Sequence, residues 1–481
     1  MVSGRWRLRF DYFFGQHGSV LLAFLIGVIA AFSVISFNYL ISPLQDRIHN
    51  QIKSDFQSGE YLRQIQLPAS SRQFPLYTDN GCLLAAMSLI APESIGAGSI
   101  SPKRPLDGTP TEATSAQVPL GICQHFGAVI DWNDGAGPMP SLEYYHRYIH
   151  GQLTLFKFVN AVTSLAIGNY FYLALCLAPL LITTLIAFAR TQRAPQARDK
   201  AFGIVAVSLA LFFGTLFFGR SPGFAPSDAV LYWFLLAAYF WPALFRGRSA
   251  CWSFSLFGAM TGIFEFLTGG LPMGISLILF SFAWPANDEQ PQPSEAIAAI
   301  SCFISAAHGT FAGKMGLVIW FWSWNEVLVF WNALNVRVSS GLEGQIDSNE
   351  IQAMAKIGLD PFGPSWNRGV ALFYAAAKIV QNAHFIGLGS RPIGAGLLVL
   401  GGMAWLLIPI MVRNFFTQLN AKLLFTSGLV IPVWFIAFTN HTIVHAGFMG
   451  RLAIWPGITA CALYFSGELE LRFKTSKIIN T

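Results

Sequence analysis

Two short segments combine histidine and arginine in a pattern that favours binding of an anion. They run from Glu143 to Gly151 and from Asn440 to Arg451. Each contains two histidines four residues apart, which on a helix places both imidazoles on one face, with an arginine nearby. Guanidinium and imidazole groups donate hydrogen bonds to phosphate oxygens, and arginine can donate two in parallel. The candidate phosphate-binding residues of these segments are therefore His146, Arg147, His150, His441, His445 and Arg451.

Two aspartates are candidates for a general base. Asp79 lies in the segment Pro75-Leu-Tyr-Thr-Asp-Asn-Gly81, just before the apolar stretch 83–90. It would be a structural residue as a helix N-cap, whereas a carboxylate held beside an apolar helix would accept a proton from a substrate. Both interpretations stay open for Asp79. Asp46, close to the end of the first apolar run, is the second candidate.

Three further charged residues border apolar segments. Lys314 has apolar sequence on both sides, so its ammonium group either extends towards water or meets an anionic group, which makes it a further phosphate-binding candidate. Glu265 lies in an apolar stretch, where an unpaired carboxylate is costly, and we expect it to pair with a basic residue. Arg220 supplies another basic residue in a turn. Glu265 and Arg220 are therefore predicted to support the site.

No motif for a nucleotide or a metal accompanies these residues. The chain has no phosphate-binding Gly-rich loop ending in Lys-Ser or Lys-Thr, no Cys-x-x-Cys pair and no dinucleotide fingerprint. The histidine pair at residues 146 and 150 lacks a third zinc ligand of suitable spacing, and isolated carboxylates make a poor magnesium site. We therefore assign no metal and no certain cofactor.

The composition shows in which solvent this chemistry would take place. The 481 residues are 54% hydrophobic and 11% charged, whereas soluble proteins are about 25% charged. So little charge excludes a soluble globular protein, and the high hydrophobicity excludes a disordered one. A polytopic membrane protein fits, and the net charge of +6 then concerns orientation in the bilayer rather than nucleic acid.

Apolar runs predict an all-α transmembrane bundle of about 10–12 spans, with a large external loop after the first helix. The first run, from Val20 to about Leu40, is too long for a cleaved signal peptide. Segments 316–335 and 366–388 are aromatic and amphipathic, which is typical of helices at the membrane interface. The remaining runs are 168–189, 202–219, 228–245, 250–267, 271–284, 296–312, 392–412, 421–439 and 449–466.

Basic residues in short connections predict the orientation. They fall at alternate ends of the runs, and lysine and arginine mark the cytoplasmic side, so both termini are expected inside. No internal repeat is visible, which argues against many transporter folds. The predicted organisation is 1–40, N-terminal tail and first helix; 41–165, external loop with interfacial helices; 166–312, transmembrane bundle; 313–390, external interfacial segment; and 391–481, C-terminal helices and cytoplasmic tail.

Two of the six cysteines lie in the external loop. Cys82 and Cys123 are on the oxidising side, where disulfides persist, and we expect them to be bonded to each other. The alternative is two unpaired buried thiols. The other four lie in apolar runs, where a thiol acts as a small hydrophobic group.

The ordered set of motifs resembles the type C membrane glycosyltransferases of bacteria, which take a sugar from a polyprenyl-phosphate carrier on the outer face of the inner membrane. The chain has no Asp-Asp or Asp-Glu pair directly after the first helix, where the type C pattern has one, so the base stays open between Asp79 and Asp46. The motifs that carry the resemblance are Tyr77-Thr-Asp-Asn80, Tyr145-His-Arg-Tyr-Ile-His-Gly151, Phe264-Glu-Phe-Leu-Thr268 with Leu271-Pro272, Gly313-Lys314, and Asn440-His-Thr-Ile-Val-His445 with Arg451.

The resemblance implies a mechanism and partners. The polyprenyl tail of the donor would lie between helices in the bilayer, and the cations would neutralise charge on the leaving phosphate. Asp79 would accept the proton of a hydroxyl on a cell-envelope glycan or lipid acceptor, and direct displacement would invert the anomeric carbon. A lipid-linked oligosaccharide polymerase or ligase, a lipid or solute transporter, and a receptor or assembly scaffold remain the alternatives.

Overall fold

The computed structural model describes most of the chain. Side chains of residues 3–17, 75–80, 122–125, 248, 333, 336–338 and 444 lie outside this description, although their backbone is included. The described ranges are 3–59, 75–90, 94–105, 122–146, 149–194, 196–264, 269–284, 292–338, 354–360, 366–383, 390–412 and 418–466, with residues 363, 386 and 415.

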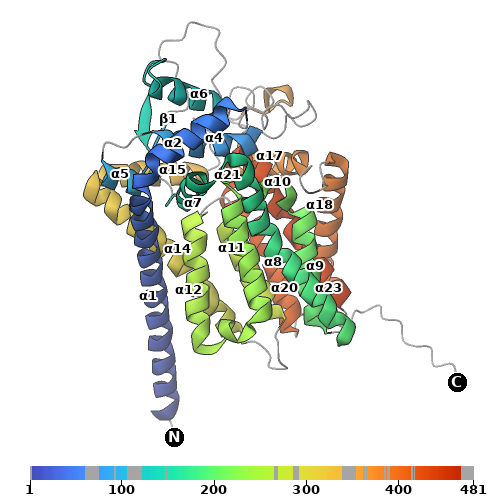
Figure 1. Ribbon diagram of the computed structural model, residues 1–481. Coiled ribbons are helices and arrows are strands. Elements are labelled where there is room, and N and C mark those ends of the chain that lie inside the picture. The colour runs from blue at the N-terminus through green and yellow to red at the C-terminus, as the bar shows by residue number, and fades with distance from the viewer. Residues whose placement is uncertain are drawn as a thin grey trace, which may run out of the picture.

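The described residues form a helical bundle with a cap over one end (Figure 1). The fold is almost entirely α-helical, which confirms the predicted class. Every apolar run predicted from the sequence overlaps a helix of the bundle. These helices are α1 (Ser3–Leu40), α8 (Leu165–Arg193), α9 (Ala197–Phe212), α11 (Ala225–Phe240), α12 (Gly247–Phe264), α13 (Gly270–Ala283), α14 (Pro293–Phe321), α18 (Arg391–Leu406), α20 (Leu419–Ala437) and α23 (Trp455–Ser466).

Several of these helices suit a bilayer. Within the described residues, five segments are long and apolar enough to cross a membrane, and three shorter apolar helices accompany them. The number of crossings stays a prediction. The five segments are Gly18–Gln57, Leu165–Arg193, Pro293–Phe321, Leu419–Ala437 and Ala446–Ser466.

The cap is built from the segment after α1 and from short helices nearer the C-terminus. Its two strands pair antiparallel, with Arg104 opposite Glu143. Its elements are η1 (Ser42–Leu44), α2 (Gln45–Gln57), α4 (Pro75–Leu89), α5 (Ile95–Ile100), β1 (Lys103–Pro105), α6 (Ile122–Asn133), β2 (Leu142–Tyr144), α7 (Gly151–Val162), α15 (Trp324–Val338), α17 (Arg368–Gln381), α21 (Thr439–Val444), α22 (Ala446–Met449) and η5 (Gly450–Ile454). Short connections are α10 (Thr215–Phe218), η3 (Pro242–Phe245) and α19 (Ile408–Met411).

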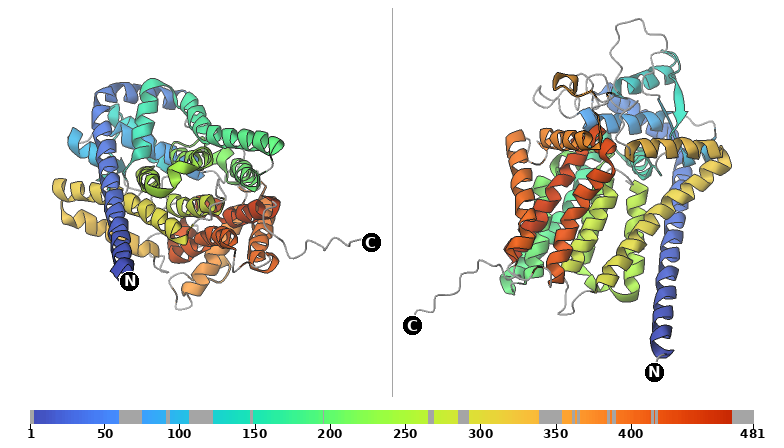
Figure 2. Two further views of the ribbon diagram at one scale, coloured as in Figure 1. Left: turned by 90° about the horizontal axis from the view of Figure 1, so that it is seen from below. Right: turned by 180° about the vertical axis from the view of Figure 1, so that it is seen from behind.

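The helices α15 and α17 run across the bundle axis at the cap end (Figure 2, right). This direction suits helices at an interface, as the aromatic segments 316–335 and 366–388 predict. The first segment is divided, however, because α14 continues to Phe321 before α15 begins at Trp324. The predicted domain boundary at residue 313 therefore falls inside a helix.

The cap has its own apolar core, which fixes it to the bundle. Buried side chains of α2, α4, α6 and α7 pack together, with Ile48, Ala85 and Phe126 fully buried. The buried carboxylate of Asp55 accepts a hydrogen bond from the backbone N–H of Leu165, the first residue of α8. A side chain of the cap thus satisfies a free donor at the N-terminus of a bundle helix.

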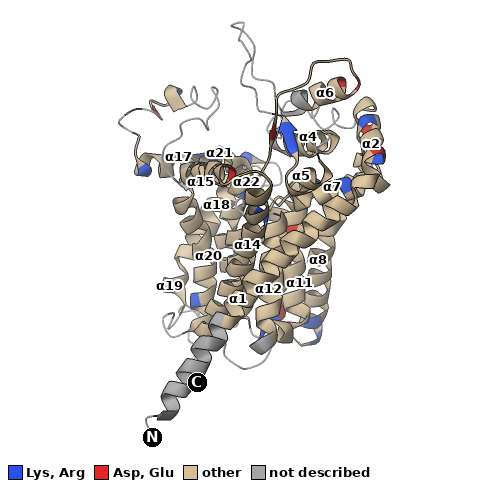
Figure 3. Ribbon diagram, turned by 90° about the vertical axis from the view of Figure 1, so that its left-hand side faces the viewer, with Lys and Arg blue, Asp and Glu red and all other residues tan. Residues whose placement is uncertain are grey.

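The ends of the chain and the charged residues both lie away from the middle of the described bundle. The start of α1 and the end of α23 lie at the end opposite the cap (Figures 1 and 2), and charged residues lie mainly at the two ends and in the cap (Figure 3). At the end opposite the cap, Arg198 donates hydrogen bonds to the carbonyl groups of Trp284, Ala238 and Tyr239. One guanidinium group therefore joins the ends of α9, α11 and α13.

Glycine lets α1 approach α14 closely. A Cβ atom at Gly27 would lie 2.0 Å from the carbonyl oxygen of Ala306, and one at Gly309 would lie 2.1 Å from that of Phe24. Only a residue without a Cβ atom fits such a backbone contact, which is how transmembrane helices gain packing in a solvent as apolar as their side chains.

The cysteines follow the expected division between loop and bundle. Cys82 forms a disulfide bond, and the side chain of its expected partner, Cys123, lies outside the described residues. Cys176, Cys251, Cys302 and Cys461 are free thiols.

Candidate functional site

The N-terminus of α7 brings a histidine of the first motif against the bundle. His150 has a left-handed backbone conformation, with φ 64°, which is uncommon for a residue other than glycine. The next residue must be small, because a Cβ atom at Gly151 would lie 2.4 Å from the side chain of Ile263 at the end of α12. The start of α7 is therefore held tightly against α12.

His150 is held as a neutral imidazole. Its side chain is buried, and its Nε2 donates a hydrogen bond to the carbonyl oxygen of Tyr145 at 2.6 Å. Burial lowers its pKa well below 6.5, and the charge of Lys314 lowers it further. Because Nε2 carries the proton, Nδ1 is the acceptor nitrogen.

His146 lies in the same polar region. Its Nδ1 is 2.9 Å from the hydroxyl of Ser101, and its Nε2 is 3.7 Å from a carboxylate oxygen of Glu326 on α15. Its ring contacts that of Trp322 at a centroid distance of 4.7 Å. Burial, and then the charge of Lys314, lowers the pKa of His146 to about 4, so at neutral pH the contact with Glu326 joins a carboxylate to a neutral ring.

Two lysines complete this cluster. Lys314, on α14, is fully buried, and its charge acts on both imidazoles. Lys157, on α7, also acts on His150, and burial lowers the pKa of Lys157 to about 8. We call His146, His150, Lys157 and Lys314 the cap–bundle cluster. It combines two lysine side chains with two imidazoles, a set that can provide hydrogen-bond donors to an anion.

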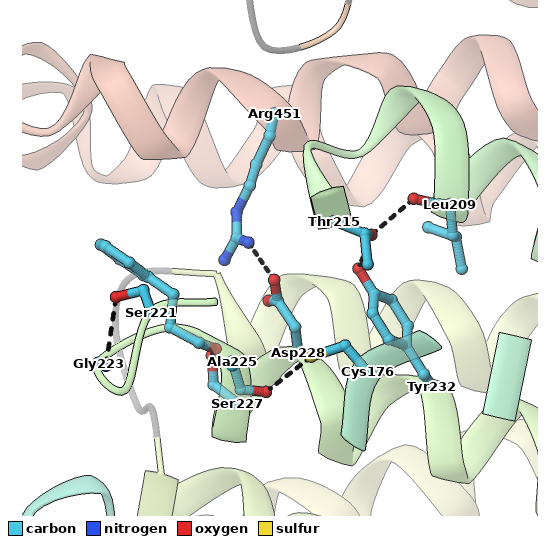
Figure 4. Close-up of polar contacts among 11 residues, drawn as sticks. Cys176, Leu209, Thr215, Ser221, Gly223, Ala225, Ser227, Asp228, Tyr232 and Arg451 are labelled. Carbon is cyan, nitrogen blue, oxygen red and sulfur yellow. Dashed lines mark hydrogen bonds and ion pairs between the residues drawn. The ribbon is translucent and has the colours of Figure 1, made fainter. Parts of the chain in front are cut away.

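The arginine of the second motif is paired inside the bundle. Arg451, in η5, forms an ion pair with Asp228 of α11 (Figure 4). Their side chains are 3% and 1% exposed. The guanidinium group also lies 5.0–5.7 Å from the ring centroids of Phe213, Phe218 and Phe224. Its charge already has a counter-charge inside the bundle, which favours a structural role in which Arg451 fastens η5 to α11. The predicted phosphate-binding role stays untested.

Asp228 is the residue that the sequence analysis missed. It occupies the first turn of an apolar helix, where an acidic side chain needs a partner. The sequence therefore indicates a buried partner for Asp228, by the same reasoning that applies to Glu265. Nearby, the hydroxyls of Thr215 and Tyr232 lie 2.7 Å apart, and the thiol of Cys176 donates to the carbonyl oxygen of Ala225 (Figure 4).

The second histidine pair is connected by aromatic contacts to the rings that surround Arg451 of the buried ion pair. The rings of His441 and His445 contact each other at 4.4 Å, and that of His445 contacts Phe448 at 4.9 Å. Phe448 in turn contacts Phe224, one of the three rings around Arg451, with the ring centroids 5.1 Å apart. The helix α15 connects the elements of the two groups, because it packs against both α14, which carries Lys314, and α21, which carries His441. The prediction of a single site stays untested.

The other predicted residues are placed as follows. Asp46 is exposed in the first turn of α2. Arg220 is exposed just after α10, with its guanidinium carbon 5.8 Å from the ring centroid of Tyr170. Asp79 is the fifth residue of α4 and therefore does not cap that helix, and its side chain lies outside the described residues. Arg147 and Glu265 lie outside them entirely. The identity of a base is thus untested.

Neither a metal centre nor a relative directs the assignment further. In the part of the chain that the structure describes, no three His, Cys, Asp or Glu side chains are grouped so that they could hold a metal ion. The cap–bundle cluster and its surroundings are therefore the features of the structure that bear on function. No protein-family model, curated protein or solved structure matches this chain.

Proposed function

We propose that this protein is a membrane glycosyltransferase, which transfers a sugar from a polyprenyl-phosphate carrier to a cell-envelope glycan or lipid. In this proposal it spans the bacterial inner membrane with both termini in the cytoplasm, and the cap faces outward. The observation that carries the proposal is the meeting of His146, His150, Lys157 and Lys314 where the cap joins the bundle. The resemblance in sequence favours the same function.

An apolar groove supports a lipid-linked donor. It has a volume of about 510 Å³ and is lined by side chains of α7, α8, α11, η3 and α12. Its wall on α11 extends from Pro226 to Trp241, about 22 Å at 1.5 Å per residue. At the cap end it reaches Phe264, whose ring would lie 3.1 Å from a Cβ atom at Gly151. A polyprenyl tail in this groove would bring its phosphate towards His150.

The cluster provides the charge that this reaction needs. As the bond between the anomeric carbon and the phosphate oxygen breaks, negative charge grows on the leaving phosphate. Lysine ammonium groups stabilise that charge, and the neutral imidazole of His146 can donate one hydrogen bond without adding to the repulsion among cations. The single N–H of His150 is already used on the carbonyl oxygen of Tyr145, so His150 positions the start of α7. The acceptor hydroxyl attacks the opposite face of the sugar and gives its proton to a carboxylate, for which Asp79 is our first choice and Asp46 the second.

The test is turnover in reconstituted proteoliposomes with a radiolabelled polyprenyl-phosphate sugar and a membrane extract as acceptor. Lys314→Met should lower turnover at least about 100-fold if it stabilises the leaving phosphate. Asp79→Asn should abolish turnover, whereas Asp46→Asn should not. Lys53→Gln, which changes an exposed lysine of the cap, is the control.

The outcomes separate the parts of this proposal. Normal turnover of Asp79→Asn with loss in Asp46→Asn would move the base to Asp46. Normal turnover in a folded Lys314→Met protein would refute the assignment of the cluster to the donor phosphate. Movement of the labelled lipid across the bilayer without chemical change would instead indicate a transporter.

A further inference from the structure

A second polar region lies where α1 leaves the bundle. A cavity of about 300 Å³ opens there between α1, α2, α4, α5 and α7. Its polar lining includes Asn38, Gln45, Lys103 and Lys157. It shares a wall with the cap–bundle cluster, because Pro102 lines the cavity while the neighbouring Ser101 contacts His146. The apolar groove lies elsewhere and shares none of these lining residues.

Asn38 lines this cavity and has a buried acceptor atom with no hydrogen-bond partner among the described residues. The residue is 5% exposed, and its Nδ2 donates to the carbonyl oxygen of Ser99 at 3.2 Å. Its Oδ1 is buried and has no hydrogen-bond partner. A buried polar atom left in this state costs about 1–3 kcal/mol, and a ligand hydroxyl would satisfy it.

Two lysines make the cavity cationic. Lys157 has no hydrogen bond or ion pair with any described residue, and burial lowers its pKa. The Nζ of Lys103 lies 5.0 Å from the ring centroid of Tyr144. Gln45 uses its amide N–H₂ on the carbonyl oxygen of Ser88, which leaves its amide oxygen as a second acceptor. No carboxylate is among the described residues that line the cavity.

Much of the remaining lining is apolar, and part of it belongs to a candidate membrane span. Ile41, Met87, Ile90 and Ile95 form part of the wall, and Asn38 lies within the membrane-crossing segment that begins at Gly18. A ligand that fits must combine a negative charge, a hydroxyl donor and an apolar portion. The volume of about 300 Å³ is at the small end for ligand sites, which suits a headgroup rather than a whole lipid.

We propose that this cavity binds the headgroup of an anionic phospholipid whose phosphate ester carries a free hydroxyl, of the phosphatidylglycerol class. Lys157 and Lys103 contact the phosphate, and Asn38 Oδ1 accepts a hydrogen bond from the glycerol hydroxyl. The acyl chains extend over the apolar wall into the bilayer. This site adjoins the proposed donor site, because Lys157 belongs to both, but binding of the lipid needs no sugar donor.

The experiment measures lipid binding to the purified full-length protein by native mass spectrometry. The probes are dioleoyl phosphatidylglycerol, dioleoyl phosphatidic acid, which lacks the glycerol hydroxyls, and dioleoyl phosphatidylcholine, which is zwitterionic. We expect phosphatidylglycerol to bind best and phosphatidylcholine least. Lys157→Gln should weaken both anionic lipids about tenfold or more, and Lys157→Arg should restore them.

Asn38 tests the role of the hydroxyl. Asn38→Ala should weaken phosphatidylglycerol about fivefold to tenfold and leave phosphatidic acid unchanged, because only the former donates a hydrogen bond to the amide oxygen. Lys53→Gln is the matched control, an exposed lysine on α2 whose ammonium group pairs with Asp134 outside the cavity. It should bind all three lipids like the natural protein.

Four results would overturn the proposal. Equal binding of phosphatidylglycerol and phosphatidylcholine would exclude an anionic-lipid site, and unchanged binding by folded Lys157→Gln would place that site elsewhere. Competition by soluble glycerol 1-phosphate at the same concentration as the lipid would show that the bilayer is not involved. Displacement by a polyprenyl phosphate at equal concentration would assign the cavity to the sugar donor. Since no transfer is measured, these results are independent of the turnover test above.

Discussion

The ion pair between Arg451 and Asp228 gives the sharpest prediction about stability. Asp228→Asn keeps the shape of the side chain and leaves the guanidinium group of Arg451 buried without its counter-charge. The residues are 3% and 1% exposed, so water cannot replace the lost carboxylate. Removing one partner of a buried ion pair costs about 3–5 kcal/mol.

The surroundings of Arg451 reduce this loss slightly. Three phenylalanine rings already contact the guanidinium group, and each retained cation–π contact is favourable by about 0.5–2 kcal/mol. We therefore expect the lower end of the range, about 3 kcal/mol, which is more than a 100-fold change in the unfolding equilibrium. Asp228→Leu combined with Arg451→Met removes both charges and should come close to the stability of the natural protein.

The assay is equilibrium unfolding in mixed micelles of a mild detergent and sodium dodecyl sulfate, followed by tryptophan fluorescence. Glu143→Gln is the control, because its carboxylate pairs with Arg104 but is 39% exposed. An exposed pair contributes about 0–1 kcal/mol. If Asp228→Asn changes stability no more than Glu143→Gln does, the ion pair does not fasten η5 to α11 and our interpretation of Arg451 is wrong.

The same variants separate a structural role from a phosphate-binding role. The double variant lacks the arginine but keeps the packing, so it should retain sugar transfer if Arg451 only joins two elements. Loss of turnover in the folded double variant would return Arg451 to the donor site.

Packing and protonation give two further predictions. Gly309→Ala should destabilise the protein by roughly 2 kcal/mol, because its Cβ would overlap the carbonyl oxygen of Phe24. Gly316→Ala in the same helix is the control: its Cβ meets no atom within 4 Å, and the substitution should be neutral or slightly stabilising. Equal effects of the two substitutions in the unfolding assay would contradict the close contact of α1 with α14. The pKa of His146 is lowered from 6.5 to about 4, so the unfolded chain takes up the proton first as the solution is acidified. Above pH 6.5 His146 is neutral in both the folded and the unfolded chain and does not reduce stability. As the pH is lowered from 6.5 to 4, proton uptake by the unfolded chain should lower the free energy of unfolding by about 3 kcal/mol. His146→Gln should remove this part of the pH dependence, and an unchanged stability curve in the variant would argue against a buried neutral imidazole.

The helices were predictable because an apolar run of about 20 residues has few other structures in a bilayer. The ends were less predictable. Lys314 interrupts the apolar run that contains α14, and the helix nevertheless continues to Phe321. From the sequence we predict that the transmembrane bundle ends at residue 312, just before Lys314. Burial against α1 and the cap instead allows this charged residue to lie inside the helix.

The candidate site was predictable in part. The spacing of His146 and His150 indicated that they act together, and the structure places both in the cap–bundle cluster. They do not share one helical face, as the spacing of four suggested, because His150 precedes α7 in a left-handed conformation. Lys157 was missed, since a lysine in a semi-apolar helix resembles any solvated residue until the cavity beside it is known.

The sequence alone determined the helical class, the apolar runs that could cross a membrane and the short list of charged residues that require partners. These follow from local composition, because each apolar run must satisfy its own backbone hydrogen bonds, and each charge in it needs a counter-charge. Which charges meet was decided by the tertiary structure. Arg451 and Asp228 are 223 residues apart, and only the packing of η5 on α11 joins them in an internal ion pair. The tertiary structure likewise brings His146, His150, Lys157 and Lys314 together where the cap joins the bundle, because these residues come from the cap and from α14.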